Sequence, residues 1–398
     1  MSKLEELIQQ YCPDGVEWKQ LGDICNIKGR IGFRGYTRND QVKEGEGALS
    51  LSPSNIQDGQ MDYSKGTYIT WQKYEESPEI MTFNGDIVFC KTASVGKVAL
   101  VKDLPYKATI NPQLVVLKDI QCNSPFLAYV LGTDLVQNKV ISLAGVGSVP
   151  NISQKALSEI EIPVPPLPVQ EEIVRVLDTF TELQAELQAE LQKRKQQYNF
   201  YRDNLLNFKN INRGGQEIKW MKIGEICNVI TGGEVPVDSI KGDTPQGDFK
   251  YPIWGNGKDI YGYSATYQIT QDAVCISSIG ANTGAVFFHS AYFTPIIRLK
   301  VLIPLSKKVS TKYLFYILST IGFDVKKSSV PNMNSTEVKQ KRIPIPPLAE
   351  QNRIVSILDR FDTLTNDLTS GLPAEIEKRR LQYEFYRDKL LTFKRKEA

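Results

Sequence analysis

The sequence of 398 residues has a single histidine, His289, and six cysteines that form no CxxC pair. One histidine excludes a multi-histidine metal site. Cysteines this scattered predict reduced thiols in a cytoplasmic protein, most of them small core residues, and neither a disulfide framework nor a zinc site. No run of about 18 apolar residues occurs, which predicts that no segment spans a membrane. The start, MSKLEELIQQYCPDG, carries charges where a signal peptide needs an apolar core.

Catalytic signatures are also missing. No GxxxxGK[ST] phosphate-binding loop is present, which argues against an ATPase. The segment Asn111–Leu114 (NPQL) lacks the second proline and the aromatic residue of the NPPY-type methyltransferase motif, and no Rossmann-like region for S-adenosylmethionine accompanies it. In Asp14–Lys19 the aspartate lies too close to ExK for a nuclease centre, so a turn is favoured there. His289 has no G-x-S-x-G partner motif. These absences indicate a binding protein.

A strongly basic surface is absent as well. The chain has 48 Lys and Arg against 45 Asp and Glu, a net charge of +3. A protein that bound nucleic acid through its whole surface would be more basic. This balance favours local basic patches, or a partner that carries part of the positive surface.

One long stretch dominates what is present. From Glu171 to Lys209 apolar residues recur at steps of three and four, with one step of seven, and no glycine or proline intervenes. This pattern predicts an amphipathic helix of roughly 60 Å. A second stretch, Asn352–Lys394, repeats the apolar stripe, and both stretches end in YxFYRDxLLxFK. A long helix with a narrow apolar stripe usually packs against another, so we expect the two helices to pair.

The repeat extends upstream of both helices. IPVPPLPVQ from Ile162 matches IPIPPLAEQ from Ile343, and SVPN occurs at Ser148 and again at Ser329. Near the start of each half, WKQLGDICN from Trp18 matches WMKIGEICN from Trp220. The chain therefore consists of two halves, each a globular block followed by a long helix. The middles of the blocks differ strongly, which suggests one frame that holds two different binding surfaces.

These patterns predict an α+β protein: two mixed α/β heads, mostly antiparallel in their sheets, and two long helices that form an antiparallel coiled coil. Two equal half-units pack most readily with twofold symmetry, here a pseudo-twofold internal repeat. The expected domains are 1–165 (first head with an N-terminal helix), 166–212 (first long helix), 213–346 (second head) and 347–398 (second long helix). Asn207–Gln216 is the expected linker.

Shorter elements are expected within the heads. Helices are expected at Lys3–Tyr11, Pro125–Asn138, Gln154–Leu157 and Thr311–Ile321, and strands at Gly85–Cys90, Val98–Val101, Leu114–Leu117 and Asp272–Ile276.

Divergent loops lie between the matched strands. The first half has the basic, glycine-rich Lys28–Arg38 and Lys91–Lys97, and the second has Tyr251–Lys258 and Ser277–Gly284. Such side chains on loops contact phosphates and base edges of DNA, although glycine-rich polar loops can also simply turn the chain. The side chains expected to face DNA are Arg30, Arg34, Arg38, Lys91, Thr92 and Lys97, and Trp254, Asn256, Lys258, Ser278, Asn282 and Thr283.

The order of block, helix, block, helix resembles the specificity (S) subunit of type I restriction-modification systems over essentially the whole chain. The motifs that carry the resemblance are CPDGVEWKQLGDIC, SVPNIS, IPVPPLPVQEEIV and YRDNLLNF, and then SVPNMN, IPIPPLAEQNRIV, GLPAEIEKRR and YRDKLL.

The resemblance implies two target recognition domains, each reading one half of a bipartite double-stranded DNA site, and a coiled coil that sets their separation. It implies assembly with two modification (methyltransferase) subunits and with restriction (translocase and nuclease) subunits. The partners would carry S-adenosylmethionine, ATP and Mg, and this chain no cofactor, metal or catalytic residue. Two other interpretations remain: a coiled-coil protein-interaction scaffold without DNA specificity, and an enzyme with an unrecognised site.

Two departures from an exact repeat lie in the helices. Gly371-Leu372-Pro373 should kink or break the second helix where the first is continuous. In the first helix Glu182–Gln192 repeats the unit ELQA, which predicts a ruler whose length sets the spacer. The matched segments Pro163–Pro168, Pro344–Pro347, Tyr198–Phe208 and Tyr383–Phe393 are candidates for partner docking; the tyrosine-rich ends could equally form only the helix-pair core.

Overall fold

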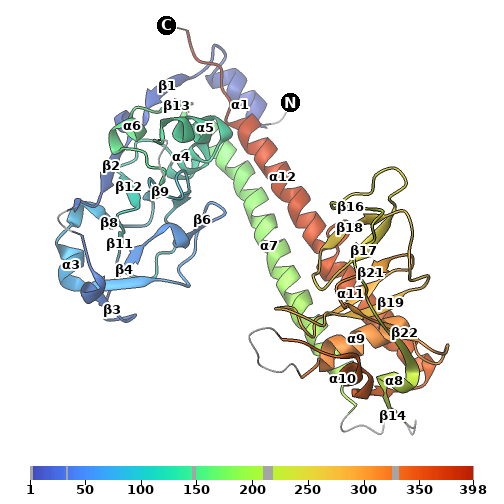
Figure 1. Ribbon diagram of the computed structural model, residues 1–398. Coiled ribbons are helices and arrows are strands. Elements are labelled where there is room, and N and C mark those ends of the chain that lie inside the picture. The colour runs from blue at the N-terminus through green and yellow to red at the C-terminus, as the bar shows by residue number, and fades with distance from the viewer. Residues whose placement is uncertain (1–2, 33–34, 146–148, 209–217, 325–330, 398) are drawn as a thin grey trace. The chain divides into compact units, whose positions relative to one another are not determined.

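The computed structural model describes residues 3–32, 35–145, 149–208, 218–324 and 331–397 (Figure 1). The chain divides into two compact units. The first unit comprises Met1–Leu187 and Ile376–Ala398, and the second comprises Gln188–Glu375. The expected linker lies outside the described residues from position 209 onward.

Among its described residues, the first unit contains two small strand pairs and two larger sheets, and one of the pairs is β5 (Ile56–Gln57) with β6 (Gln60–Met61). Strand β1 (Glu17–Gln20) pairs antiparallel with β13 (Glu161–Val164), with Trp18 opposite Pro163. The four-stranded antiparallel sheet has the order β10-β9-β12-β2, and the five-stranded sheet has the order β3-β7-β4-β11-β8, in which β4 and β11 are parallel. The bounds are β2 Asn26–Gly29, β3 Gln41–Val42, β4 Gly47–Leu51, β7 Thr67–Thr70, β8 Met81–Thr82, β9 Ile87–Cys90, β10 Val98–Leu100, β11 Ala108–Ile110 and β12 Leu114–Lys118.

The second unit repeats this plan with different sequences. Strand β14 (Lys219–Lys222) pairs with β23 (Arg342–Ile345), with Trp220 opposite Pro344. An antiparallel sheet of order β15-β22-β19-β20 matches β2-β12-β9-β10, and a sheet of order β16-β18-β17-β21 again contains one parallel pair, β17 with β21. The bounds are β15 Cys227–Thr231, β16 Ser239–Lys241, β17 Tyr251–Trp254, β18 Ile260–Ser264, β19 Ala273–Ile276, β20 Val286–His289, β21 Thr294–Pro295 and β22 Lys300–Pro304.

Most of the expected shorter elements are present. Helices α1 (Lys3–Tyr11) and α9 (Thr311–Ile321) have the predicted bounds, and α6 (Gln154–Ser158) begins after the Ser153 N-cap. Short helices α2 (Leu21–Ile24), α8 (Ile223–Ile226), α3 (Trp71–Glu75) and α10 (Ser335–Gln340) complete the heads. The four strands predicted within the heads appear as β9, β10, β12 and β19.

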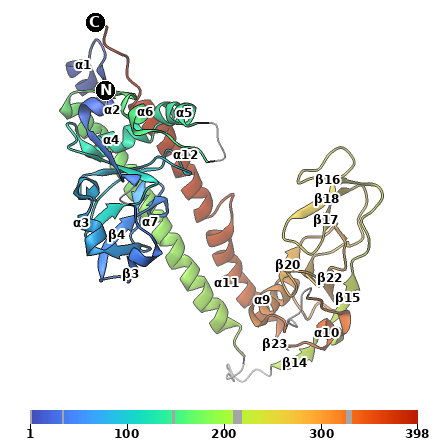
Figure 2. The same ribbon diagram turned by 60° about the vertical axis from the view of Figure 1, so that its left-hand side comes forward.

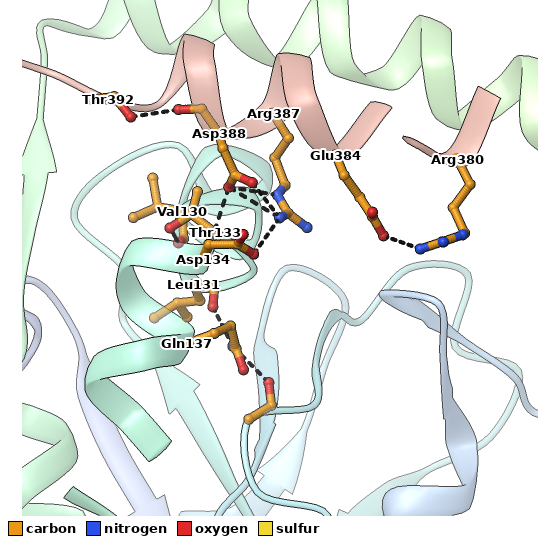
Figure 3. A network of polar contacts seen from close by, with 11 residues as sticks. Val130, Leu131, Thr133, Asp134, Gln137, Arg380, Glu384, Arg387, Asp388 and Thr392 are labelled. Atoms are coloured by element: carbon orange, nitrogen blue, oxygen red, sulfur yellow. Dashed lines mark hydrogen bonds and ion pairs between the residues drawn. The ribbon is translucent and has the colours of Figure 1, made fainter. Parts of the chain in front are cut away.

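The prediction of one helix over Pro125–Asn138 is wrong. Two helices occupy this region, α4 (Ser124–Leu131) and α5 (Asp134–Leu143). Gly132 ends the first helix, and the Thr133 hydroxyl donates to the Val130 carbonyl at 2.7 Å. The amide of Gln137 donates to the Leu131 carbonyl at 2.6 Å, which satisfies a carbonyl at the end of α4 (Figure 3).

The first long helix, α7, runs from Leu167 to Leu205 and contains 39 residues. Both ends lie four residues before the predicted bounds of Glu171 and Lys209. Pro168 is tolerated because the first turn of a helix has no intrahelical acceptor for its N–H groups. At the other end Leu205, Leu206 and Phe208 are buried in the core of the second unit, where the helix ends.

The second long helix is interrupted, as predicted. Helix α11 spans Leu348–Asn366 and α12 spans Leu372–Leu390. Between them the Asp367 carboxylate accepts hydrogen bonds from the Thr369 backbone N–H at 2.7 Å and the Ser370 hydroxyl at 2.5 Å. A Cβ at Gly371 would lie 2.5 Å from the Thr363 carbonyl oxygen, so only glycine permits this approach.

The long helices pack against each other in an antiparallel order. In the first unit Phe180 of α7 stacks on Tyr386 of α12, with ring centroids 5.5 Å apart. In the second unit Tyr201 of α7 stacks on Phe361 of α11 at 5.4 Å. The early part of α7 therefore contacts the late part of the second helix, and the late part of α7 contacts its early part.

A buried glutamine fixes the first turn of each long helix to its head. Gln170 donates to the Pro165 carbonyl at 2.6 Å and accepts from the Asn123 backbone N–H at 2.9 Å. Its counterpart Gln351 donates to the Pro346 carbonyl at 2.8 Å and accepts from the Ser310 N–H at 2.9 Å. Each glutamine thus joins the proline-rich entry of the long helix to the start of α4 or α9.

A tyrosine–aspartate bond adds a second attachment two turns further along. The Tyr129 hydroxyl donates to Asp178 at 2.5 Å, and the Tyr316 hydroxyl donates to Asp359 at 2.7 Å, where α9 lies beside α11 (Figure 2). In the first unit α12 is also tied to α5, because Arg387 lies 3.3 Å from Asp134 (Figure 3).

Candidate nucleic-acid interface

The turn between β9 and β10 in the first unit is held by the SVPN segment. The Ala93 backbone N–H donates to the Pro150 carbonyl at 2.9 Å, and the Ile152 N–H donates to the Lys91 carbonyl at 2.9 Å. The Thr92 hydroxyl donates to the Asn151 side chain at 2.7 Å. These bonds fix the backbone at Lys91 and Thr92.

The turn between β19 and β20 in the second unit is held in the same way. The Gly280 N–H donates to the Pro331 carbonyl at 3.0 Å, and the Met333 N–H donates to the Ser278 carbonyl at 2.8 Å. The Thr283 hydroxyl reaches the Pro331 carbonyl at 3.1 Å. Lys91 and Ser278 therefore occupy equivalent positions, and Pro150 with Ile152 in the first head makes the same backbone bonds as Pro331 with Met333 in the second.

The amide side chain of Asn256 brings several predicted residues of the second unit together. Its oxygen accepts from the Ser278 N–H at 2.7 Å and from the Ser277 hydroxyl at 3.3 Å. Its nitrogen donates to the Ile297 carbonyl. The side-chain amide nitrogen of Asn282 lies 3.5 Å from the backbone carbonyl oxygen of Asn256. Asn256, Ser278 and Asn282 thus form one cluster.

The predicted site residues differ in accessibility. The exposed ones are Arg38, Lys97, Lys258 and Asn282; the half-buried ones are Lys91, Thr92, Trp254, Asn256 and Thr283. Arg30 is 7% exposed and Ser278 is fully buried. Arg34 lies outside the described residues.

Arg30 supports its loop from inside. Its Nε donates to the Ile110 carbonyl at 3.1 Å, and a terminal nitrogen donates to the Thr109 hydroxyl at 3.2 Å. The guanidinium also lies 5.3 Å from the centre of the Tyr36 ring. Burial lowers the pKa of this guanidinium. The sequence identified the charge of Arg30 but could not show that the side chain points inward.

Trp254 lines an open cleft of about 610 Å³ in the second unit, together with Lys258 and the aromatic rings of Phe315 and Tyr316. Its indole stacks on His289 with ring centroids 4.1 Å apart. His289 is 7% exposed, and its Nε2 is buried without a partner among the described residues. Burial lowers the pKa of His289 to about 4, so the ring is neutral at pH 7.

Two residues outside the predicted set, Ile297 and Arg298, lie in an exposed turn beside Asn256 and Ser278. The sequence gives no signal for this turn, because neither isoleucine nor arginine favours positive φ.

Comparison with known proteins gives the family. The family described as "Type I restriction modification DNA specificity domain" matches residues 13–194 and 216–378. The chain therefore belongs to the type I restriction-modification specificity family: it is a DNA target-recognition subunit and a non-catalytic part of a type I complex.

Individual relatives cover much of the chain. A protein of Mycoplasma pneumoniae named as a type I specificity subunit is 34% identical over 72% of this chain and 88% of its own length. The EcoR124I/EcoR124II specificity subunit of Escherichia coli is 37% identical over 62% of this chain and 66% of its own length. The crystal structure of an S subunit from M. genitalium has the same fold, with a TM-score of 0.59 at 16% identity over 95% of this chain and 96% of that one.

Within the described residues, no cluster of three His, Cys, Asp or Glu side chains could hold a metal ion. None of the helices in that part of the chain is long and apolar enough to cross a membrane.

The buried imidazole predicts an acid-sensitive second head. An unfolded histidine has a pKa of about 6.5, so between pH 6.5 and 4 the unfolded chain binds a proton that the folded chain does not. Stability is therefore full above pH 6.5 and falls as the pH drops, by about 2 kcal/mol from this group at pH 5. Urea unfolding at pH 7 and pH 5 measures the loss. Because His289 is the only histidine, His289→Gln should lose about 2 kcal/mol less than the wild type over this interval. An equal loss in both proteins would contradict the assignment.

Proposed function

We propose that each head recognises one half of a bipartite duplex DNA target and that the long helices set the spacer between the halves. The observation that carries the proposal is the pair of equivalent turns, after β9 and after β19, held by the same SVPN bonds but carrying different side chains. A shared frame with different exposed residues is what two different half-sites require.

The recognition domains in this proposal are residues 1–165 and 213–346, and the connecting helices are 166–212 and 347–398. The residues best placed for DNA are those with exposed or half-buried polar side chains on the loops: Arg38, Lys91, Thr92, Lys97, Trp254, Lys258, Asn282 and Thr283. Arg30, Asn256 and Ser278 act from within the fold, since their polar atoms bond to neighbouring backbone. A scaffold without DNA specificity would give no electrophoretic shift of duplex DNA with or without the modification subunit.

The ELQA repeat supports a ruler in α7. Leu183, Leu187 and Leu191 are half-buried, whereas Glu182 and Glu186 are exposed. These leucines follow Phe180 at steps of 3, 4 and 4, a period of eleven residues that should locally relax a left-handed supercoil. A unit of four residues is close to one helical turn, so its removal keeps the leucine stripe in register.

Deleting Glu186–Ala189 should shorten the spacer and leave both half-sites unchanged. The helix loses about 6 Å, and a base pair occupies about 3.4 Å, so the spacer should shorten by one to two base pairs. Long-read mapping of methylated sites, after co-expression with the modification subunit, measures both quantities. The wild type should give one bipartite motif. An unchanged spacer in the deletion variant would exclude the ruler, and a wild type without a bipartite motif would exclude the proposed function.

Two modification subunits and the restriction subunits are the proposed partners. Two copies of one subunit need the same surface twice, and the repeat provides it at the ends of α7 and α12. Phe200 is 65% exposed and its counterpart Phe385 is 62% exposed. Beside Phe385 an open groove is lined by Leu381, Glu384 and Lys389. The adjacent tyrosines, Tyr201 and Tyr386, instead stack within the helix pair.

Replacing both phenylalanines should weaken docking without unfolding the chain. Phe200→Ser with Phe385→Ser removes mainly exposed apolar surface, with one edge contact each to Tyr201 and Tyr386, so the melting temperature should stay near that of the wild type. Co-purification should fall from two modification subunits per chain to fewer. Phe83→Ser is the matched control, because Phe83 is 55% exposed but lies outside the repeat. Full 2:1 recovery with the double variant would count against this surface.

A further inference from the structure

A tight turn in the second head has an unusual backbone. Ile297 and Arg298 are consecutive residues with φ values of 52° and 60°. The Leu299 N–H donates to the Ile296 carbonyl at 3.1 Å and closes the turn. Positive φ normally favours glycine or asparagine, and for a β-branched residue such as isoleucine it is a true outlier. Backbone of this kind persists only where its surroundings enforce it, and it concentrates at functional sites.

All four backbone polar groups of Ile297 and Arg298 are bonded. Their N–H groups donate to the carbonyls of Gly233 at 2.8 Å and Gly232 at 3.1 Å. The Ile297 carbonyl accepts from the Asn256 amide, and the Arg298 carbonyl accepts from the Ser278 hydroxyl at 2.6 Å. Two of the residues predicted to bind DNA are therefore the ones that hold this turn.

The turn presents two side chains to the outside. Ile297 is 48% exposed, and Arg298 is exposed as well. The guanidinium of Arg298 makes no hydrogen bond or ion pair with other described residues. Burial and the charge of Arg298 lower the pKa of Lys300, whose ammonium group donates to the Thr231 hydroxyl at 3.2 Å. The turn thus combines a hydrogen-bonded backbone with the unpaired guanidinium of Arg298 and the exposed apolar side chain of Ile297.

The first head has a counterpart turn between β11 and β12. The Leu114 N–H donates to the Asn111 carbonyl at 3.2 Å, and the Lys91 N–H donates to the Gln113 carbonyl at 2.9 Å. The carbonyl of Gln113 is thus bonded by the backbone N–H of Lys91, whereas that of Arg298 is bonded by the side-chain hydroxyl of the equivalent residue, Ser278. The turn occupies the same place in both heads, but its tip changes from Pro112-Gln113 to Ile297-Arg298, and positive φ occurs at both residues of the second tip and at neither residue of the first.

We propose that Arg298 and Ile297 read bases of the second half-site, which deepens and rests on the proposed DNA-recognition function. The planar guanidinium matches the O6 and N7 acceptors of guanine in the major groove, and an isoleucine side chain suits the methyl group of thymine. A rigid backbone keeps the ordering cost of such contacts low. Asn256 and Ser278 are positioning residues in this arrangement.

The test compares Arg298→Ala and Arg298→Lys with the wild type, each assembled with its modification subunits. Methylated motifs are mapped, and affinity is measured for duplexes changed at each position of both half-sites. Arg298→Ala should weaken cognate binding by about 5- to 150-fold and relax one position in the second half-site only. Arg298→Lys should recover only part of this loss, because its point charge lacks the fork geometry. Lys307→Ala, an exposed cation elsewhere in the same head, is the matched control and should change neither quantity.

Positioning by Asn256 has a separate readout. Asn256→Ala should weaken binding of the cognate duplex while the preferred base stays the same, and circular dichroism should report a folded chain.

Arg298→Ala could instead weaken binding to all duplexes equally and reduce by about one the slope of log affinity against log salt concentration. That result would show a phosphate contact and overturn base reading. An unchanged motif and affinity would also overturn it. A wild-type complex without any bipartite motif would overturn the proposed function itself.

Discussion

The attachment of each long helix to its own head is the constraint on which the rest of the structure depends. Gln170 and Gln351 are buried amides that bond the proline-rich entry of the helix to the first turn of α4 or α9. Removing either side chain would leave the buried proline carbonyl without its partner, at a cost of about 1–3 kcal/mol. The Tyr129–Asp178 and Tyr316–Asp359 bonds add a second point of attachment to each helix. A helix held at two points cannot rotate freely relative to its head. The length of the helix can therefore determine the length of the DNA spacer between the two half-sites.

In both heads, one set of residues holds the backbone of the turns through hydrogen bonds, and a different set of side chains lies at the tips of the turns. In both, the SVPN segment bonds the backbone of the turn after β9 or β19. In both, the residue that begins this turn, Lys91 or Ser278, bonds the carbonyl of a second turn. The side chains of Pro112, Ile297 and Arg298 make none of these bonds, so they can change without loss of these attachments. This arrangement explains why the middles of the blocks diverge while their flanks repeat.

The sequence alone was sufficient for the features that depend on periodicity or on the internal repeat. The apolar stripe predicts α7 and its helical partner, the internal repeat predicts their antiparallel order, and Gly371 and Pro373 predict the break between α11 and α12. The division of Pro125–Asn138 at Gly132 was missed, because a glycine inside an apolar pattern can be tolerated and only the tertiary bonds of Gln137 show the break. The site was harder to predict. Residue type marked Arg30 and Ser278 as exposed polar groups, yet both are buried, and Ile297-Arg298 carries no turn signal since neither residue favours positive φ.

In this protein the repeated segments are expected to set the position of each head, and the divergent loops are expected to set the DNA sequence that it reads. Replacing the second head by a copy of the first, between the matched segments WKQLGDICN and SVPN, tests it most directly. With an antiparallel, pseudo-twofold helix pair, two identical heads should read the same half-site in inverted orientation. Mapping of methylated sites for this chain with its modification subunit should therefore give a palindromic motif with a spacer close to that of the wild type. A direct repeat, or the unchanged wild-type motif, would contradict the account.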